Sequence, residues 1–340
     1  MRQIVLEQPG NFTSGETAHP GKPGPGEALV RIHRVGICGT DLHAFRGKQP
    51  YFTYPRRLGH ELGVEVVAIG SGVENLKVGQ RCAVEPYLTC GKCIACRAGK
   101  TNCCMELKCL GVHVDGGMCE EMILPAAKLH PSDKLTFEQL ALVETLGIGC
   151  HAVNRANLQR GEWALVIGAG PIGLTAVQFA KAAGAEVIVM DVVDSRLKFC
   201  QKELGVEYLI NPKNGPTLEQ LEKICSKELA QNVFDCTGNV ESMQQAFQFV
   251  SPGGKLIFVG LVQADVSFND PHFHRREITL FASRNAMGKE LKSIIQMIEA
   301  KKIDTTPWIT HRSSFDRLIA DFPTWLTPES GCIKAMLELQ

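Results

Sequence analysis

Four cysteines in one short stretch have the spacing of a metal site. Cys90, Cys93 and Cys96 follow one another at intervals of three, and Cys104 comes eight residues later. Four thiolates around Zn²⁺ form the closed kind of site that stabilises a fold. Cysteine spacing alone does not fix the metal, so an iron–sulfur cluster and a chance group of buried thiols are alternatives. The short, charged segment favours zinc, and Cys103 is an alternative fourth ligand.

A second set of potential ligands lies in three distant segments. Cys38 comes first, His60 and Glu61 follow as neighbours, and Glu144 is much further along the chain. A thiolate, an imidazole and a carboxylate can form a zinc site that leaves one position for water or substrate. Each residue also has an ordinary interpretation, as a core residue or a solvated carboxylate. The residues alone therefore do not decide whether the three segments meet.

A glycine-rich turn lies between an apolar stretch and a helical pattern. Gly168, Gly170 and Gly173 form the pattern G-x-G-x-x-G, in which the first glycine permits a tight turn and the second lets the backbone approach a pyrophosphate. The third lets the helix pack close to the strand, and the helix N-terminus faces the anion. Because such turns also occur without a ligand, the pattern alone is weak evidence.

The end of the next apolar stretch strengthens this interpretation. Asp191 stands roughly 20 residues further on, where a carboxylate accepts hydrogen bonds from the adenosine ribose. A carboxylate there repels a 2′-phosphate, so the sequence favours NAD over NADP. Arg196 lies nearby and would soften that preference, although a solvated arginine at the start of a helix is an equal alternative.

The composition is that of an ordinary globular protein. Hydrophobic residues make up 44% and charged residues 21% of the 340 residues, and Lys plus Arg equal Asp plus Glu at 36 each. This balance predicts no nucleic-acid or membrane partner. The uncharged run Trp163–Ala180 is broken by glycines, and the start of the chain does not resemble a targeting segment. Fourteen cysteines in a chain of this size favour reduced thiols, so we expect a cytoplasmic protein.

The pattern of elements changes near Cys150. Before it, short apolar runs at 28–33, 64–69 and 81–84 alternate with Pro- and Gly-rich segments and predict a β-rich domain. After it, strands alternate with helical stretches at 172–183 and 240–249, which predicts a parallel sheet covered on both faces. Beyond Ser283 we expect helical and then irregular structure. The strands predicted for the parallel sheet are Trp163–Ile167, Glu186–Met190, Tyr208–Ile210, Val233–Asp235, Lys255–Val259 and Ile278–Ala282.

Together these motifs resemble one family, the zinc-containing medium-chain dehydrogenases. The resemblance rests on Gly36–His43, Gly59–Glu61, the four-cysteine segment, Val112–Gly117 and the glycine turn, which occur in the family's order and at its usual spacings. It implies an α/β fold, with a doubly wound, parallel, six-stranded Rossmann sheet that binds NAD at residues 150–284. A β-rich GroES-like catalytic domain is implied at 1–149, with a structural zinc lobe at about 86–108, and the chain returns to this domain at 285–340.

The resemblance also assigns roles to residues. Thr40 and His43 match the positions of a proton relay, and Glu144 tunes the catalytic site. The catalytic zinc ligands that it implies, with one glutamate or the other bound at a time, are Cys38, His60, Glu61 and Glu144. The structural zinc ligands that it implies are Cys90, Cys93, Cys96 and Cys104. The residues expected to bind the cofactor are Gly168, Gly170, Pro171, Ile172, Gly173, Asp191, Arg196, Thr237, Gly260 and Arg284.

Within the family the chain is most similar to the polyol, threonine and sugar-acid branch. Glu144 stands where the ethanol-type enzymes carry a cysteine. The segments Phe268–Glu277 and Ala282–Asn285 are similar to those of galactonate-type oxidoreductases, and Arg284 falls where the polyol enzymes place a substrate-contacting arginine. The resemblance therefore implies a polyol or a sugar acid as substrate.

Two positions depart from the family's pattern. Val64 stands where a glycine is usual, which predicts a shifted backbone just after the ligands. Tyr87 replaces a histidine characteristic of threonine dehydrogenases, which weakens the hypothesis of an L-threonine 3-dehydrogenase-like enzyme. A non-catalytic zinc- and nucleotide-binding relative is a further alternative. An open metal position together with Thr40 and His43 argues against it, because a pure binder needs no proton exit.

The predicted reaction moves a hydride between a secondary alcohol and NAD. Zinc would polarise the substrate hydroxyl, NAD would accept the hydride, and Thr40 and His43 would carry the proton to solvent. A sugar-acid carboxylate would pair with an arginine, although most of these side chains could equally be solvated charges. The last strand of the parallel sheet would be an open edge, so we expect a homodimer or homotetramer. The candidate arginines are Arg284, Arg56, Arg57 and Arg275.

Overall fold

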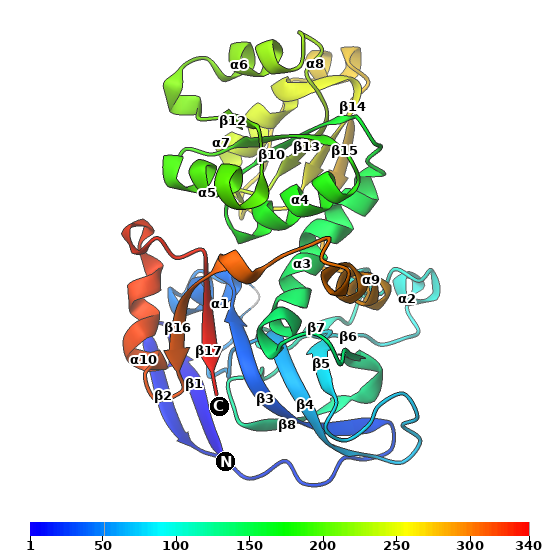
Figure 1. The fold of residues 1–340 in the computed structure, drawn as a ribbon, viewed down its shortest axis with the longest axis vertical. Helices are drawn as coiled ribbons and strands as arrows, with labels where there is room; N and C mark the ends of the chain where they lie inside the picture. Colours follow the sequence, from blue (N-terminus) through cyan, green and yellow to red (C-terminus); the bar gives the residue numbers. More distant parts are fainter. Residues whose placement is uncertain (51, 340) are drawn as a thin grey trace. The chain divides into compact units, whose positions relative to one another are not determined.

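The chain leaves one structural unit and later returns to it. The computed structural model describes residues 1–50 and 52–339. The first unit comprises Met1–Thr145 and Met287–Gln340, and the second comprises Leu146–Ala286 (Figure 1). The boundaries predicted from the sequence lie a few residues away, at 149/150 and 284/285. The first boundary falls inside the continuous helix α3 (Phe137–Ala156), where the sequence carries no break.

A mixed sheet forms the centre of the first unit. Its longest strand, β3, is buried along most of its length and pairs with three other strands. It pairs with β4 on one edge, and with β8 and then β17 on the other. Figure 1 shows β17, from near the end of the chain, beside β3 from near its start. The order along the sheet is β16 (Ile309–Ser314), β17 (Lys334–Glu338), β3 (Glu27–Ile37), β4 (Glu61–Ile69), β5 (Arg81–Val84) and β9 (Leu129–Pro131), with β8 (Glu121–Pro125) paired to β3.

Smaller elements complete this unit. Two two-stranded sheets are formed by β1 (Arg2–Gln8) with β2 (Asn11–Glu16), and by β6 (Tyr87–Leu88) with β7 (Lys108–Cys109). The cysteine-rich segment lies between β6 and β7. The core includes Val64, which pairs with Ile32 and Cys82 and is fully buried. The helices are α1 (Gly39–Phe45), α2 (Ile94–Arg97), the start of α3, α9 (Gly288–Glu299) and α10 (Leu318–Asp321).

The second unit is a six-stranded parallel sheet. Its strands read 3-2-1-4-5-6 in chain order, which is the doubly wound Rossmann arrangement. The central strands are buried on both faces, as parallel sheets require. The order along the sheet is β12 (Tyr208–Ile210), β11 (Glu186–Met190), β10 (Trp163–Ile167), β13 (Ala230–Asp235), β14 (Val250–Phe258) and β15 (Thr279–Ala282).

Helices cover both faces of this sheet. In Figure 1, α4 and α5 lie on one side of the sheet and α6 lies on the other. Pro171 occupies the first turn of α4, where its missing N–H costs no hydrogen bond. The helices are α4 (Pro171–Ala182), α5 (Asp194–Leu204), α6 (Thr217–Ile224), α7 (Val240–Ala246) and α8 (Asp270–Arg275), with a 3₁₀ turn at Phe247–Phe249.

The parallel sheet agrees with the sequence prediction, whereas the C-terminal segment does not. All six predicted strands of the parallel sheet are present, and β13 and β14 begin earlier than expected. The prediction of irregular structure after α9 is wrong, because β16 and β17 add two strands to the catalytic sheet. β16 is polar and β17 begins with a lysine, so the sequence of neither segment indicates a core strand.

Among the described residues, no helix has the length and apolarity needed to span a bilayer.

Candidate active site

Two paired strands bring Cys38, His60 and Glu61 together. Cys38 directly follows β3, His60 directly precedes β4, and Glu61 is the first residue of β4. In the antiparallel ladder Glu61 pairs with Gly36, so the end of one strand meets the start of the other. One ligand atom from each of Cys38, His60 and Glu61 lies within 4.8 Å of the others. Segments that are remote in sequence thus meet at one buried place.

Asp41 lies behind His60. It is fully buried on α1, and its Oδ2 accepts a hydrogen bond from the backbone N–H of Cys38 at 2.9 Å. Its Oδ1 lies 3.8 Å from His60 Nδ1, and neither atom has a hydrogen-bond partner among the described residues. Burial would lower the pKa of His60, but the negative charges of Asp41 and Cys38 outweigh burial and raise this pKa well above its ordinary value. The surroundings of His60 therefore attract positive charge.

Glu61 is held from two sides. Lys334 Nζ donates to both carboxylate oxygens, at 2.6 and 2.8 Å, and both side chains are almost completely buried. On the other side lies Gly36, where an added Cβ would be only 2.0 Å from Glu61 Oε2. Burial raises the pKa of Glu61, but the positive charge of Lys334 outweighs it and lowers this pKa below its usual value. Glu61 is thus a fixed carboxylate anion.

Glu144 has different neighbours. It is buried on α3, and Tyr87 Oη donates a hydrogen bond to its Oε1. Within the described part of the chain, Glu144 is not among the residues whose ligand atoms meet within 4.8 Å. Burial raises the pKa of Glu144, and the nearby charge of Glu61 adds to this effect, although His60 acts in the opposite direction. Glu144 is therefore close enough for the charges of His60 and Glu61 to affect its pKa.

Thr40 and His43 lie on one short helix. They are three positions apart on α1, so they share a face. Thr40 is half-buried and His43 is exposed, which is the order that a path from a buried site to solvent requires. Burial lowers the pKa of His43, and the positive charges of Arg46 and Lys48 lower it further.

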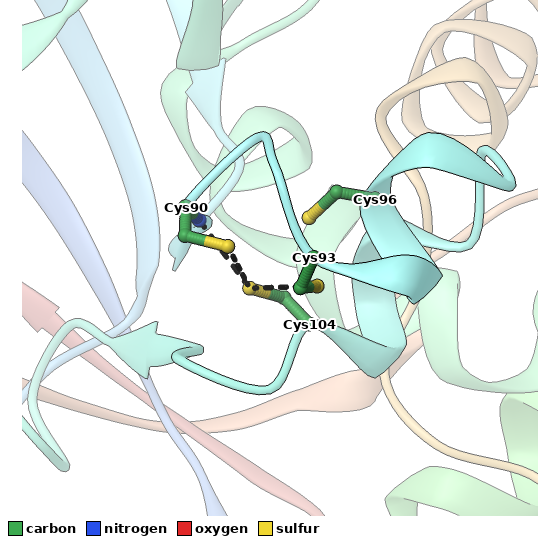
Figure 2. Close-up of side chains that lie close together, drawn as sticks. All are labelled: Cys90, Cys93, Cys96 and Cys104. Carbon is green, nitrogen blue, oxygen red and sulfur yellow. Dashed lines mark hydrogen bonds between the residues drawn. The ribbon is translucent and has the colours of Figure 1, made fainter.

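Four thiols meet in the segment between β6 and β7. Figure 2 shows Cys90, Cys93, Cys96 and Cys104 with their side chains directed toward one another. The sulfur of Cys104 lies 3.5 Å from that of Cys90 and 4.0 Å from that of Cys93, which is too long for a disulfide. The neighbouring Cys103 is exposed and lies outside this group.

The glycine turn in the second unit has the geometry that its sequence predicts. Gly168 adopts a φ of +92° directly after β10. At Gly173 an added Cβ would be 1.7 Å from the carbonyl oxygen of Gly168, so only glycine lets α4 pack this close. At Gly170 an added Cβ would meet nothing within 4 Å, which leaves the backbone open to a ligand. Ile172 follows in the first turn of α4.

Asp191 ends the neighbouring strand and contacts this turn. It directly follows β11, and its Oδ2 accepts a hydrogen bond from the backbone N–H of Ala169 at 2.7 Å. Arg196, on α5, has a guanidinium nitrogen 3.8 Å from the same oxygen. The carboxylate therefore lies at the carboxyl end of the sheet, where ligands of doubly wound folds bind.

The remaining predicted cofactor residues follow the next strands. Thr237 lies just after β13, and its Oγ1 donates to Asp235 Oδ1 at 2.7 Å. Gly260 follows β14 at close approach, because an added Cβ there would be 2.3 Å from the backbone nitrogen of Gly238. Arg284 follows β15 and is exposed. All three loops leave the carboxyl ends of parallel strands.

Comparison with known proteins decides the family. A profile described as the alcohol dehydrogenase GroES-like domain matches residues 24–134, and one described as zinc-binding dehydrogenase matches residues 171–300. L-Galactonate-5-dehydrogenase from Escherichia coli K12 is 41% identical over 99% of this chain and 98% of its own length. The chain belongs to the zinc-dependent alcohol dehydrogenases. This membership confirms the predicted fold class, the enzyme class and the predicted cofactors, zinc and NAD.

Other relatives support the same branch of this dehydrogenase family. Sorbitol dehydrogenase from Bacillus subtilis is 34% identical over 92% of this chain and 90% of its own length. A solved structure described as an alcohol dehydrogenase from Escherichia coli CFT073 in complex with NADH is 30% identical, with a TM-score of 0.93. It covers 100% of this chain, which covers 99% of that one. The chain is thus a zinc-type dehydrogenase of the polyol and sugar-acid branch.

The donor sets fit the metal of this dehydrogenase family. Zn–S bonds of about 2.3 Å in a tetrahedron place sulfur atoms about 3.8 Å apart, and the observed separations are 3.5 and 4.0 Å. Backbone N–H groups of Cys96 and Met105 lower the pKa of Cys93 to about 6, which favours the thiolate that binds metal. At the other group a thiol, an imidazole and a carboxylate offer ligand atoms that lie within 4.8 Å of one another.

The sequence assigned no role at the candidate site to three residues that lie beside it. Asp41 lies within the motif Gly36–His43, Tyr87 departs from the family's pattern, and Lys334 lies in no motif. A buried lysine far from the motif has no local signal, because its partner Glu61 lies 273 positions earlier. Tyr87 carried a partial signal, since a tyrosine can donate a hydrogen bond where the usual histidine is missing. The ladder between β3 and β4 shifts its register between Ile32 and Arg34, opposite Val64, so the pairing is irregular where the sequence predicts a shifted backbone.

Proposed function

We propose that this enzyme oxidises a secondary hydroxyl of a sugar acid with NAD. The observation that carries the proposal is the identity of 41% with an L-galactonate-5-dehydrogenase along almost the whole chain. We further propose that Cys38 and His60 bind the catalytic zinc, that Glu61 or Glu144 supplies the third protein ligand, and that the four-cysteine group binds the structural zinc. The meeting of Cys38, His60 and Glu61 within 4.8 Å supports this assignment.

The residues around the proposed zinc site have separate roles in the reaction. When bound, zinc supplies Lewis-acid polarisation of the substrate hydroxyl, and NAD supplies the hydride acceptor. The carboxylate of Asp41 lies 3.8 Å from Nδ1 of His60, so its negative charge would favour a proton on Nδ1 and leave Nε2 for the metal. Thr40 accepts the proton of the substrate hydroxyl, and His43 passes it to solvent. The lowered pKa of His43 keeps its ring neutral, and so able to accept a proton, over a wider pH range.

Charge contacts narrow the choice of arginine for the substrate carboxylate. Arg57 donates to the carbonyl oxygen of Gly116 at 2.7 Å and to Gln3 at 2.9 Å, and Arg56 lies 3.5 Å from Asp115. These contacts tie both side chains to the fold of the first unit. We propose Arg284 on a different ground: it follows β15 at the carboxyl end of the parallel sheet, where ligands of doubly wound folds bind, and its guanidinium can pair with a carboxylate through two hydrogen bonds.

A substrate panel tests this proposal. We expect kcat/KM for L-galactonate to exceed the values for galactitol, sorbitol and L-threonine. Arg284→Gln should raise KM for L-galactonate and leave KM for the neutral polyols and for NAD nearly unchanged. Arg275→Gln, on the exposed end of α8, is the matched control. A larger loss for NAD than for L-galactonate in Arg284→Gln would instead assign Arg284 to the cofactor, and turnover of polyols alone would refute the sugar-acid proposal.

We also propose that the enzyme is a homo-oligomer joined through β15. Within the described chain this strand ends the parallel sheet and pairs only with β14. Three of its residues are exposed, including Leu280 at 39%, and an open strand edge is a template for pairing with another copy. Light scattering on Leu280→Lys should show monomers where the unmodified chain forms dimers or tetramers. An unchanged mass would refute this interface.

The reducing interior of a cell suits the proposed zinc sites. All fourteen cysteines are free thiols in the structure, and four of them gather with separations that fit a metal. Thiolate ligands persist where glutathione keeps cysteines reduced. We therefore propose a cytoplasmic location.

A further inference from the structure

Asp235 is a fully buried carboxylate with three hydrogen-bond donors. It is the last residue of β13 and is 0% exposed. Its Oδ1 accepts from the backbone N–H of Thr237 at 3.0 Å and from the hydroxyl of Thr237 at 2.7 Å. Its Oδ2 accepts from the hydroxyl of Ser242, on α7, at 2.6 Å. Because a buried charge is costly without such bonds, the loop 236–239 and the start of α7 are fixed around this side chain.

The same network fixes the loop 236–239 between β13 and α7. An ionised carboxylate can only accept, so the hydroxyl hydrogen of Thr237 points to Asp235 and the lone pairs of that hydroxyl face other donors. One of these donors is the backbone N–H of Asn239, at 3.1 Å. Asn239 in turn accepts from the backbone N–H of Ser242 at 3.0 Å and so caps α7. The path of the loop therefore depends on one buried side chain.

On one side the loop 236–239 packs against the glycine turn. The backbone N–H of Cys236 donates to the carbonyl oxygen of Ile167, the last residue of β10, at 2.9 Å. At Gly168 an added Cβ would be only 3.0 Å from Cγ2 of Thr237, so the loop and the turn leave little room for a side chain between them. The position of Thr237 and the shape of the glycine turn are therefore linked.

On the other side the loop packs against the turn that follows β14. The backbone carbonyl oxygen of Asp235 accepts from the N–H groups of Val259 and Gly260, at 2.9 and 3.0 Å. Gly238, in the loop, has a φ of +63°, and its backbone nitrogen lies where a Cβ at Gly260 would be 2.3 Å away. The turns after β10, β13 and β14 are thus packed together at the carboxyl end of the parallel sheet, where ligands of doubly wound folds bind.

We propose that Asp235 is a positioning residue that holds the loop 236–239 in the form that receives NAD. It acts through Thr237, because its own side chain is fully buried and so out of reach of a ligand. A loop that is already ordered loses little conformational freedom when the cofactor binds, which strengthens binding. This role rests on binding of NAD at the glycine turn, and on no feature of the proposed zinc sites.

Fluorescence titration with NADH tests the proposal without substrate turnover. Asp235→Ala removes both acceptor oxygens, and we expect the Kd for NADH to rise at least about tenfold, because a released loop must be ordered on binding. Asp235→Asn keeps one oxygen for Thr237 and turns an NH₂ group toward Ser242, whose hydroxyl can accept. This conservative variant should keep the Kd for NADH within about threefold of the unmodified protein.

Ser242→Ala is the matched control. It removes one hydroxyl from the same carboxylate, but Ser242 lies on α7, and Oδ1 of Asp235 keeps both bonds to Thr237. We expect a lower free energy of unfolding in chemical denaturation, with a Kd for NADH within about twofold of the unmodified protein. If Asp235 served stability alone, a folded Asp235→Ala would also bind NADH normally, and that result would overturn the proposal.

Thr237→Val keeps the test decisive if Asp235→Ala does not fold. It retains the branched shape and removes the hydroxyl that binds Asp235. In the cofactor-free protein, amide hydrogen exchange of the loop 236–239 should become at least about tenfold faster, because exchange follows local stability, while β10 and β13 keep their rates. Unchanged exchange in the loop would show that this bond does not hold it, and would overturn the proposal.

Gly170→Val separates failure of this role from failure of the cofactor site. Gly170 has a φ of −76°, and a Cβ added there meets nothing within 4 Å, so valine should leave the fold intact and block the approach of a pyrophosphate. If NADH affinity falls in Gly170→Val but not in Asp235→Ala, only the role of Asp235 fails. If Gly170→Val binds NADH normally, the predicted NAD site at the glycine turn fails, and the role of Asp235 fails with it.

Discussion

Glu61 and Glu144 are two buried carboxylates whose neighbours give them opposite properties. Burial raises the pKa of each carboxyl group. Lys334 outweighs burial at Glu61 and lowers its pKa, whereas at Glu144 burial dominates and the pKa is raised. Two carboxylates with different protonation tendencies in one site can serve different roles. Residue type alone therefore does not assign the third zinc ligand, and the fixed charge beside each glutamate matters more.

Gly36 gives a direct test of how tightly Glu61 is held. Gly36→Ala places a methyl group 2.0 Å from Glu61 Oε2, so the carboxylate or β3 must move. We expect a loss of about 1–3 kcal/mol in stability, the usual cost of overpacking a buried site, measured by chemical denaturation. Gly39→Ala is the matched control, because nothing lies within 4 Å of its added Cβ. Equal stabilities of the two variants would contradict the close contact.

Thr40 tests the proton path. Thr40→Val keeps the shape of the side chain and removes the hydroxyl, so proton transfer should slow while substrate binding stays intact. We expect kcat to fall about a hundredfold, the scale of general acid–base catalysis, with KM changed far less, in steady-state kinetics. Thr40→Ser retains the hydroxyl and should keep most of kcat. An unchanged kcat in Thr40→Val would rule out this path.

At the level of single residues, sequence motifs predicted the proposed ligands but not the residues that contact them. Cys38, His60 and the four lobe cysteines stand in short local patterns, which a sequence displays directly. Lys334 and Asp41 act through partners brought near by strand pairing and helix placement. A lysine in an isolated five-residue strand reads as a solvated charge, and only the fold places it beside Glu61.

We expect the lobe between β6 and β7 to depend on the proposed structural metal more than on a core. Its helix α2 has no buried residue, and Ile94 and Met105 are 69% and 77% exposed. Cys104→Ser should therefore let the lobe open, and trypsin should cleave it at least about tenfold faster, because cleavage follows local stability. Cys103→Ser is the matched control, since Cys103 is exposed and outside the thiol group. Equal cleavage rates in the two variants would contradict a structural metal.

We propose that Asp191, at the end of β11, sets the preference for NAD over NADP. Asp191→Asn keeps an oxygen that can accept from Ala169 but removes the charge that repels a 2′-phosphate. With Arg196 3.8 Å away, the ratio of kcat/KM for NADP to that for NAD should rise roughly tenfold to a hundredfold, the range of a charged hydrogen bond. Asp194→Asn, three positions later and bonded to Asn211, should leave the ratio unchanged. A ratio unmoved by Asp191→Asn would place the ribose elsewhere.

Strands with a clear local hydrophobic pattern were predictable from the sequence. Strands that form only because a distant segment pairs with them were not. The strands of the parallel sheet are continuous apolar runs between glycine turns and helices, so β10, β11 and β12 were predicted with their observed bounds. β16 alternates irregularly and carries mostly polar residues, and it becomes a strand because β17 pairs with it. Tertiary pairing overrides weak local preference there.

For the whole molecule, the chain's return to the first unit matters most. Residues after Ala286 supply β17, which both extends the catalytic sheet and carries Lys334. The sequence indicated a two-domain enzyme, because its predicted secondary structure changes from β-rich to strands that alternate with helices. It did not indicate that the end of the chain supports the proposed metal site, because that depends on strand order.

The proposed function requires two separate zinc sites in one chain. Metal analysis tests this requirement most directly. The zinc content of the purified protein should be about two ions per chain, and Cys38→Ser should reduce it to about one, because three-ligand sites lose affinity when a thiolate is removed. The remaining ion then belongs to the four-cysteine group. Two ions retained in Cys38→Ser, or one ion in the unmodified protein, would contradict the proposed catalytic zinc.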